Sequence, residues 1–260
     1  MRTIAICSGK GGVGKTTLSV NIALILAQIG KKVVLVDADV AMANVGIVLG
    51  IERTPISIHN VLAGENSIDD AVYEGPSKLK YVPSGLALDS IKKIDMAKFA
   101  PAIAQLEKDM DFVIIDCPPG LEQTNQQVIK SAKELFIVVT PDPPALADGL
   151  KIKQFATKHG IKVSGVIVNR AHGTPEEVKT SEISTLMGLP VIGLIPDDPD
   201  ILRSTEKQAP LALGNQGTPA GIALRQLASQ ISGEKIEMPV MKKAGFVQGI
   251  LDALFGRRNQ

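Results

Sequence analysis

The chain has 260 residues, a formal net charge of +1 and 45% hydrophobic residues, of which few are aromatic. This length allows one large domain or two small ones, and the near-neutral charge argues against a nucleic-acid binder that depends on a strong overall basic field. Cys7 and Cys117 are too few for a disulfide framework, and the N-terminus carries no secretory signal, so the cytoplasm is the expected compartment.

Short β-branched runs alternate with helical segments along the chain. Strands are expected at residues 3–8, 32–37, 79–84, 112–117, 135–140, 162–169 and 190–195, and helices at 15–30, 95–108, 121–131, 144–158, 175–187 and 218–231. The strands are continuously apolar rather than alternating, which is typical of strands covered on both faces. The order predicts an α/β fold, a doubly wound, mostly parallel sheet with helices on both faces, as in phosphate-loop (P-loop) NTPases.

The first strand is followed by "SGKGGVGKTT" at residues 8–17. Residues 9–16 fit the phosphate-loop pattern, in which backbone N–H groups and a helix N-terminus receive phosphate charge. In that pattern Lys15 reaches the β- and γ-phosphates, and the Thr16 hydroxyl takes magnesium. Lys10 is a second lysine that cannot easily curl back over the phosphates of its own loop, and the loop pattern alone assigns it no role.

Acidic residues close two of the predicted strands. Asp116 ends "FVIID", where an acid holds the magnesium hydration shell in phosphate-loop proteins, although an Asp there is also a common turn cap. Asp37 and Asp39 lie in "VDADVAMANVG". They are either a solvated pair or part of a switch segment that senses the γ-phosphate, with one carboxylate orienting the attacking water.

The C-terminal stretch has a different pattern. Residues 1–231 form the predicted domain, residues 232–241 a linker without periodicity, and residues 242–258 an amphipathic helix. Its apolar face would comprise Phe246, Val247, Ile250, Leu251, Leu254 and Phe255, with Lys242, Lys243, Arg257 and Arg258 at the two ends. This pattern is typical of a helix lying in a membrane interface. The alternative is a helix docked on its own domain or on a partner.

Three motifs together resemble one family. "KGGVGKTT", "VDADVAMANVG" and "FVIIDCPPG" are similar to the deviant phosphate-loop ATPases, most closely the MinD cell-division ATPases, over about residues 1–232. The resemblance implies an ATP-dependent homodimer in which Lys10 contacts the phosphates of the nucleotide held by the other subunit. The sequence departs from the family at Thr140-Pro141-Asp142, where many members have Asn-Pro-Glu, which puts partner binding at this edge in doubt.

The resemblance also implies the other site residues. The phosphates and magnesium would be cradled by Gly11, Gly12, Val13, Gly14, Lys15, Thr16 and Thr17. Asp39 would position water, with Lys10 and Lys15 as the catalytic lysines, and Asp37 and Asp116 would support the metal beside Thr16. Asn169 and Arg170 would meet the adenine edge, with Pro196 and Asp197 as a second wall.

The expected function is therefore a magnesium-dependent ATPase that uses ATP and ADP and positions the division site or other cargo. As an ATP dimer it would bind an anionic membrane through residues 242–258, on the inner face of the cell membrane, and hydrolysis would release it. A protein partner that stimulates hydrolysis or is recruited is expected, and nucleic acid is not. The alternatives are a ParA-type partition ATPase that binds DNA non-specifically and a nucleotide-bound scaffold that does not hydrolyse ATP.

Overall fold

The core of the computed structural model is an eight-stranded sheet in the order β3-β4-β2-β5-β1-β6-β7-β8. The structure describes residues 1–51, 54–85 and 94–239. The strands are β1 (Arg2–Cys7), β2 (Val33–Asp37), β3 (Tyr73–Glu74), β4 (Lys80–Val82), β5 (Phe112–Asp116), β6 (Glu134–Val139), β7 (Lys162–Ala171) and β8 (Val191–Pro196). All neighbouring pairs are parallel except β3 with β4 at the edge.

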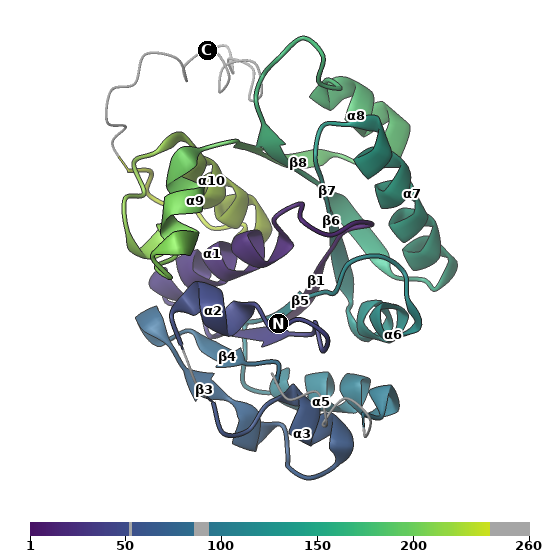
Figure 1. The fold of residues 1–260 in the computed structure, drawn as a ribbon, viewed down its shortest axis with the longest axis vertical. Coiled ribbons are helices and arrows are strands. Elements are labelled where there is room, and N and C mark those ends of the chain that lie inside the picture. Colours follow the sequence, from purple (N-terminus) through teal and green to yellow (C-terminus); the bar gives the residue numbers. More distant parts are fainter. Residues whose placement is uncertain (52–53, 86–93, 240–260) are drawn as a thin grey trace.

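Helices cover both faces of this sheet (Figure 1). They are α1 (Lys15–Gln28), α2 (Val45–Leu49), α3 (Ile58–Ala63), α5 (Phe99–Leu106), α6 (Gln123–Ser131), α7 (Pro143–Lys158), α8 (Thr180–Met187), α9 (Pro199–Glu206) and α10 (Pro219–Ser232). Short 3-10 turns occupy Asp69–Ala71, Pro76–Lys78, Met96–Lys98 and Leu211–Leu213. The predicted doubly wound α/β architecture is confirmed.

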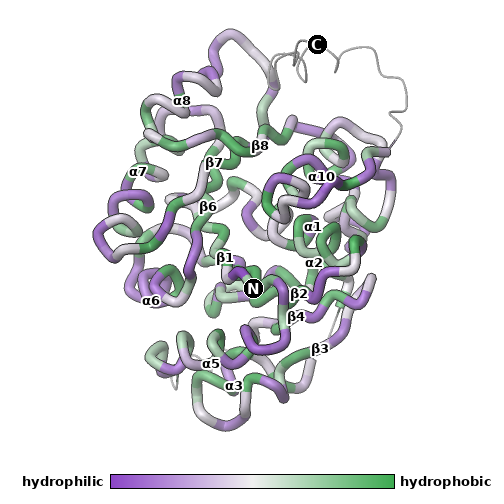
Figure 2. Tube along the Cα trace, turned by 180° about the vertical axis from the view of Figure 1, so that it is seen from behind, coloured by the Kyte–Doolittle hydropathy of each residue, from purple (hydrophilic) through white to green (hydrophobic). Residues whose placement is uncertain are grey.

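Successive residues of a strand point to opposite faces of the sheet, so each strand contributes side chains to two hydrophobic cores. Ile4 and Ile6 of β1 join a cluster with α1, α2 and α10, whereas Ala5 and Cys7 join a cluster with α3, α5, α6, α7 and α8. Figure 2 shows the consequence in the outer helices, where α7 and α10 change between hydrophobic and hydrophilic along their length. α1 is buried along most of its length, and it ends before Gly30 (φ +83°), as predicted.

The structure corrects several predicted boundaries. The helix expected over residues 175–187 begins only at Thr180, because the Glu177 carboxylate accepts the backbone N–H groups of His172 and Gly173 and holds a loop there. The helix expected at 95–108 starts as a 3-10 turn and becomes α-helical at Phe99. The short elements α2, α3, α9 and β3 were not predicted.

The segment after α10 has no helix or strand as far as residue 239, but it lies on the domain. Ile236 is buried in the core, Lys31 Nζ is 2.6 Å from Glu234 Oε1, and Arg225 donates a hydrogen bond to the Glu237 carbonyl. The described part of the predicted linker is therefore anchored beside α1 and α10. The predicted tail helix at 242–258 lies outside the described residues. None of the described helices is long and apolar enough to cross a bilayer.

Candidate functional site

The loop between β1 and α1 has the backbone that phosphate binding requires. Gly12 (φ +76°) and Gly14 (φ +92°) adopt left-handed conformations, and Gly14 is the N-cap of α1. These conformations disfavour any side chain. Gly14 also lies against Asn169, because a Cβ added there would meet Asn169 Nδ2 at 2.3 Å. A residue other than glycine at position 14 would therefore clash as well as strain the loop.

The outer side of this loop is open. A Cβ added at Gly11 or Gly12 would meet no heavy atom within 4 Å. A cavity of about 650 Å³ borders the loop here and extends to Asp142, Arg170 and Glu177. The exposed N–H groups of the loop and the positive end of α1 favour a negatively charged ligand on this side.

Behind the loop, the start of α1 meets the end of β5. Thr16 Oγ1 donates to Asp116 Oδ2 at 2.6 Å, and Ser19 Oγ donates to Asp116 Oδ1 at 2.9 Å. Lys15 is buried beside them, and its charge partly opposes the burial that raises the Asp116 pKa. The hydroxyl and carboxylate predicted to serve magnesium therefore lie together at one corner of the site. Thr17, the next residue of α1, is half-buried and its carbonyl accepts from Asn21 Nδ2.

Asp37 lies directly beside Asp116, since the two residues are register partners on β2 and β5. Burial, followed by the negative charge of Asp116, raises the pKa of Asp37 to about 8, although backbone N–H groups oppose the shift. Burial likewise raises the pKa of Asp116 to about 6, against the opposing effects of Thr16, Lys15 and Ser19. Two buried adjacent acids with raised pKa values form an environment that a cation would relieve.

Asp39 lies at the rim of this corner on the loop after β2. Its Oδ1 accepts the backbone N–H groups of Ala41 and Met42, and its own N–H donates to Asp37 Oδ1 at 3.2 Å. Asp39 is half-buried, whereas Met42 is 67% exposed. The carboxylate therefore lies between the buried acids and solvent, where a water molecule can reach it.

Lys10 lines the cavity beside the phosphate loop and is paired there with an acid. Its Nζ lies 3.2 Å from Asp142 Oδ1, at the N-cap of α7, and both side chains are more than one-third exposed. Asp142 also accepts from the Ala145 N–H and from the Thr140 hydroxyl. Within one chain, the second lysine is thus engaged by an acid rather than by its own loop.

The carboxyl ends of β7 and β8 bring the remaining predicted residues to the same edge. Asn169 is buried and its Nδ2 donates to the Val13 carbonyl at 2.7 Å, while its Oδ1 has no hydrogen-bond partner. Arg170 is exposed with φ +56°, a strained value for a side-chain-bearing residue. Pro196 is paired with Ala171, and the Asp197 N–H donates to the Ala171 carbonyl at 2.9 Å. The four residues therefore form one rim beside the phosphate loop.

These features fit a magnesium nucleotide. The loop offers N–H groups and Lys15 to phosphates, and the buried Asn169 Oδ1 is a polar atom behind the loop that has no hydrogen-bond partner. Within residues 1–51, 54–85 and 94–239, no three His, Cys, Asp or Glu side chains converge as a ready-made metal site. A magnesium ion would therefore depend on phosphate oxygens and Thr16, with Asp37 and Asp116 behind them.

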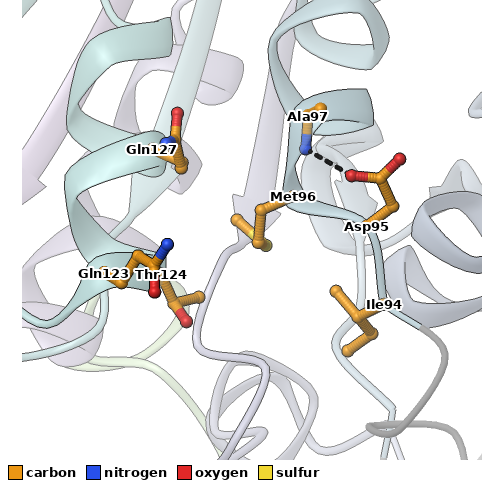
Figure 3. Close-up of a pocket in the computed structure, with 7 residues that line it drawn as sticks. All are labelled: Ile94, Asp95, Met96, Ala97, Gln123, Thr124 and Gln127. Carbon is orange, nitrogen blue, oxygen red and sulfur yellow. Dashed lines mark hydrogen bonds between the residues drawn. The ribbon is translucent and has the colours of Figure 1, made fainter.

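A second cavity, of about 380 Å³, lies between α6 and the 3-10 turn that precedes α5 (Figure 3). Its lining residues are Ile94, Asp95, Met96, Ala97, Gln123, Thr124 and Gln127. In Figure 3 the Met96 side chain projects from the turn toward α6. None of the residues predicted to bind nucleotide or magnesium lines this cavity. It is therefore separate from the site around the phosphate loop.

Ser19, Ser84 and the pairing of Asp142 with Lys10 were not predicted from sequence. The only sequence signal for Ser19 is its place one turn after Lys15 on the helix that follows the phosphate loop, and the structure buries it fully there. Ser84 donates to the Asp39 carbonyl at 2.8 Å across 45 residues of chain, and no local pattern indicates such a contact.

Comparison with known proteins gives a consistent result. Residues 1–159 match the family model described as "AAA domain". The septum site-determining protein MinD of Synechocystis is 35% identical over 247 residues, covering 90% of this chain and 91% of that protein.

Two solved structures are also similar. The septum site-determining protein MinD of Pyrococcus horikoshii, complexed with Mg-ADP, superposes with a TM-score of 0.86 and 32% identity, covering 88% of this chain and 95% of that one. The MinC:MinD cell division protein complex of Aquifex aeolicus gives a TM-score of 0.82 and 28% identity, covering 94% and 100%.

Proposed function

The chain belongs to the MinD family of septum site-determining proteins, and from this premise we propose that it is a magnesium-dependent ATPase that acts as an ATP-gated dimer at a membrane surface. The observation that carries the proposal is the corner formed by Thr16, Ser19 and Asp116 behind a phosphate loop with two lysines. A nucleotide-bound relative of the same fold holds Mg-ADP, which supports the same ligand here.

Each part of the site has a distinct role in this proposal. Backbone N–H groups of residues 11–16 and the Lys15 ammonium bind the β- and γ-phosphates. When bound, magnesium neutralises phosphate charge, with Thr16 as a ligand and Asp37 and Asp116 accepting from its water shell. Asn169 and Arg170 hold the adenine edge, with Pro196 and Asp197 beyond it. Asp39 orients the attacking water.

Lys10 is the residue on which the proposed dimerisation depends. Its ion pair with Asp142 is exposed, and such pairs contribute about 0–1 kcal/mol. A γ-phosphate presented by a second copy of the chain carries more charge than one carboxylate, so the lysine can exchange partners when ATP is bound. Lys10 then acts in trans, as an arginine finger does in other phosphoryl-transfer enzymes.

Membrane and protein partners complete the proposed cycle. The apolar face and basic ends of residues 242–258 support attachment to anionic lipid when two tails are presented together. Hydrolysis separates the subunits and weakens that attachment. A relative forms a MinC:MinD complex, which supports a protein partner for this chain also.

ATP hydrolysis by the purified chain tests the site directly. Lys15→Ala should weaken ATP binding by about 10- to 150-fold, because a charge-assisted hydrogen bond contributes about 1.5–3 kcal/mol. Asp39→Ala should keep ATP binding but reduce turnover by about 100-fold or more, because a positioned base or water contributes about 10²–10⁴. Nucleotide affinity and phosphate release are measured for each variant.

Lys151→Ala is the matched control, since Lys151 is a surface lysine paired with Asp148 on α7. It should hydrolyse ATP like the parent. Parent-like binding and turnover in Lys15→Ala would refute the phosphate-loop assignment. Loss of ATP binding in Asp39→Ala would show that Asp39 supports the fold rather than the chemistry.

A further inference from the structure

His59, in the first turn of α3, is buried and uses both ring nitrogens. Gly85 N donates to its Nδ1 at 2.7 Å, and its Nε2 lies 2.9 Å from the Val40 carbonyl oxygen. Because Nδ1 accepts a hydrogen bond, the ring proton is on Nε2, which donates to Val40. Burial lowers the His59 pKa against the opposing effect of that bond to Val40, so the ring stays neutral near pH 7.

These two bonds join two loops at the same edge of the sheet. β2 and β4 are parallel neighbours, so the loops that follow them emerge side by side. Val40 belongs to the loop after β2 and directly follows Asp39, whereas Gly85 belongs to the loop after β4. Ile58, which precedes His59, donates from its N–H to the Pro83 carbonyl at 2.9 Å. The first turn of α3 thus holds both loops.

The same junction holds the backbone of Asp39. Ser84, next to Gly85, donates from Oγ to the Asp39 carbonyl oxygen at 2.8 Å. Asp39 and Val40 therefore have consecutive carbonyl groups fixed by two buried side chains, Ser84 and His59. The side-chain bonds of Asp39, by contrast, go to the exposed residues Ala41 and Met42 of its own loop.

Glycine at position 85 is an independent sign that this junction is closely fitted. A Cβ added there would meet His59 Nδ1 at 2.6 Å and Ser57 Oγ at 2.9 Å. The loop after β4 can approach the imidazole this closely only because residue 85 has no side chain.

We propose that His59 is a positioning residue for ATP hydrolysis, which through Val40, Gly85 and Ser84 fixes the Asp39 backbone and so aims its carboxylate at the attacking water. This inference rests on the proposed role of Asp39. His59 itself touches no nucleotide atom in this scheme. It determines how often Asp39 is in its productive place, and a misplacement of about 1 Å can cost about 100-fold in rate.

The test is steady-state ATP hydrolysis by the full chain, with ATP affinity and thermal midpoint measured for each variant. His59→Phe removes both hydrogen bonds and should lower kcat by about 10- to 100-fold while ATP affinity changes by less than about twofold. His59→Gln retains one donor and one acceptor and should recover most of the rate. Gly85→Ala should resemble His59→Phe. His159→Phe, at the exposed end of α7, is the control and should match the parent.

The outcomes separate this inference from the function on which it rests. If Asp39→Ala is slow but His59→Phe and Ser84→Ala keep the parent kcat, the positioning role is refuted and the ATPase proposal stands. If Asp39→Ala hydrolyses ATP at the parent rate, the proposed function fails first. Equal loss of affinity and kcat, or no recovery in His59→Gln, would show a merely structural histidine. If His59→Phe does not fold, Ser84→Ala decides, since it removes one hydroxyl and should lower kcat at unchanged affinity.

Discussion

Lys10 is the site residue whose surroundings must change most between a single chain and the proposed dimer. In one chain it is held by Asp142, which is also the N-cap of α7. Asparagine caps helices as well as aspartate does, so Asp142→Asn removes the charge without removing the cap. This separates the ion pair from the stability of α7.

Substitutions of Lys10 and of Asp142 should change ATP-dependent dimerisation in opposite directions. Lys10→Ala should bind ATP nearly as well as the parent, because Lys15 and the loop N–H groups remain, but it should fail to dimerise. Asp142→Asn should tighten ATP-dependent dimerisation by up to about 30-fold, because a competing ion pair of up to about 1 kcal/mol is lost in each of the two subunits. Light scattering at several protein concentrations measures both. Tight ATP dimers of Lys10→Ala would exclude the in-trans role.

The raised pKa values of Asp37 and Asp116 predict that the stability of the fold depends on pH. The Asp37 pKa is raised from an ordinary 3.8 to about 8 in the fold, so the unfolded chain ionises first as pH rises. The ligand-free protein should therefore lose stability between about pH 4 and pH 8. The magnesium ion of bound Mg-ADP would supply positive charge beside the ionised carboxylates, so Mg-ADP should raise the melting temperature more at pH 8 than at pH 6. Asp37→Asn should show a smaller dependence on pH, and an equal dependence would contradict the assignment.

At the scale of elements, regular hydrophobic patterns were predictable and distant contacts were not. The strands and the helix after the phosphate loop follow from apolar runs and from Gly30. α2 begins where Asp37, the last residue of the preceding strand β2, accepts the N–H groups of Asn44 and Val45 from seven and eight residues away, and no apolar repeat indicates this contact. α9 has an evident start at Asp198-Pro199, but it buries no residue and so lacks the apolar stripe by which a helix is detected.

The residues of the site also fall into those that the sequence predicts and those that it does not. The phosphate loop and its acids could be predicted, because each chemical role requires a residue type at a fixed spacing along the chain. The contacts of His59 and of Ser84 could not, because they join segments that only the sheet order brings together.

In the proposed cycle, the C-terminal helix at 242–258 would link nucleotide to membrane. Ile250→Glu places a charge in the middle of its apolar face, where burial at headgroup depth is costly. It should reduce binding to anionic liposomes by at least about tenfold and leave ATP-dependent dimerisation unchanged, because Ile236 and Glu234 hold the preceding segment on the domain. Gln248→Glu, on the polar face, is the control. If Ile250→Glu blocks dimerisation, the helix is a packing element instead.

Membrane attachment of the whole molecule, as proposed, depends on how many C-terminal tails are presented together. Six large apolar side chains gain at most about 1.5–3 kcal/mol each on full burial, and shallow insertion and ordering of the tail remove much of this. Basic residues add about 1 kcal/mol each near anionic lipid. A single tail is then marginal, whereas two linked tails strengthen binding by about 10²–10⁴ through effective concentration. In the proposed cycle, dimerisation would therefore suffice to switch attachment.

Co-sedimentation with anionic liposomes in ADP and in ATP measures whether nucleotide controls membrane attachment, with Lys10→Ala and Asp39→Ala beside the parent. We expect weak binding in ADP, strong binding in ATP, and persistent binding of Asp39→Ala in ATP because the ATP in its dimer is not hydrolysed. Lys10→Ala should bind in ATP only as weakly as the parent does in ADP. Equal binding of the parent in ADP and ATP, or parent-like binding of Lys10→Ala, would contradict the claim that nucleotide controls attachment through the dimer.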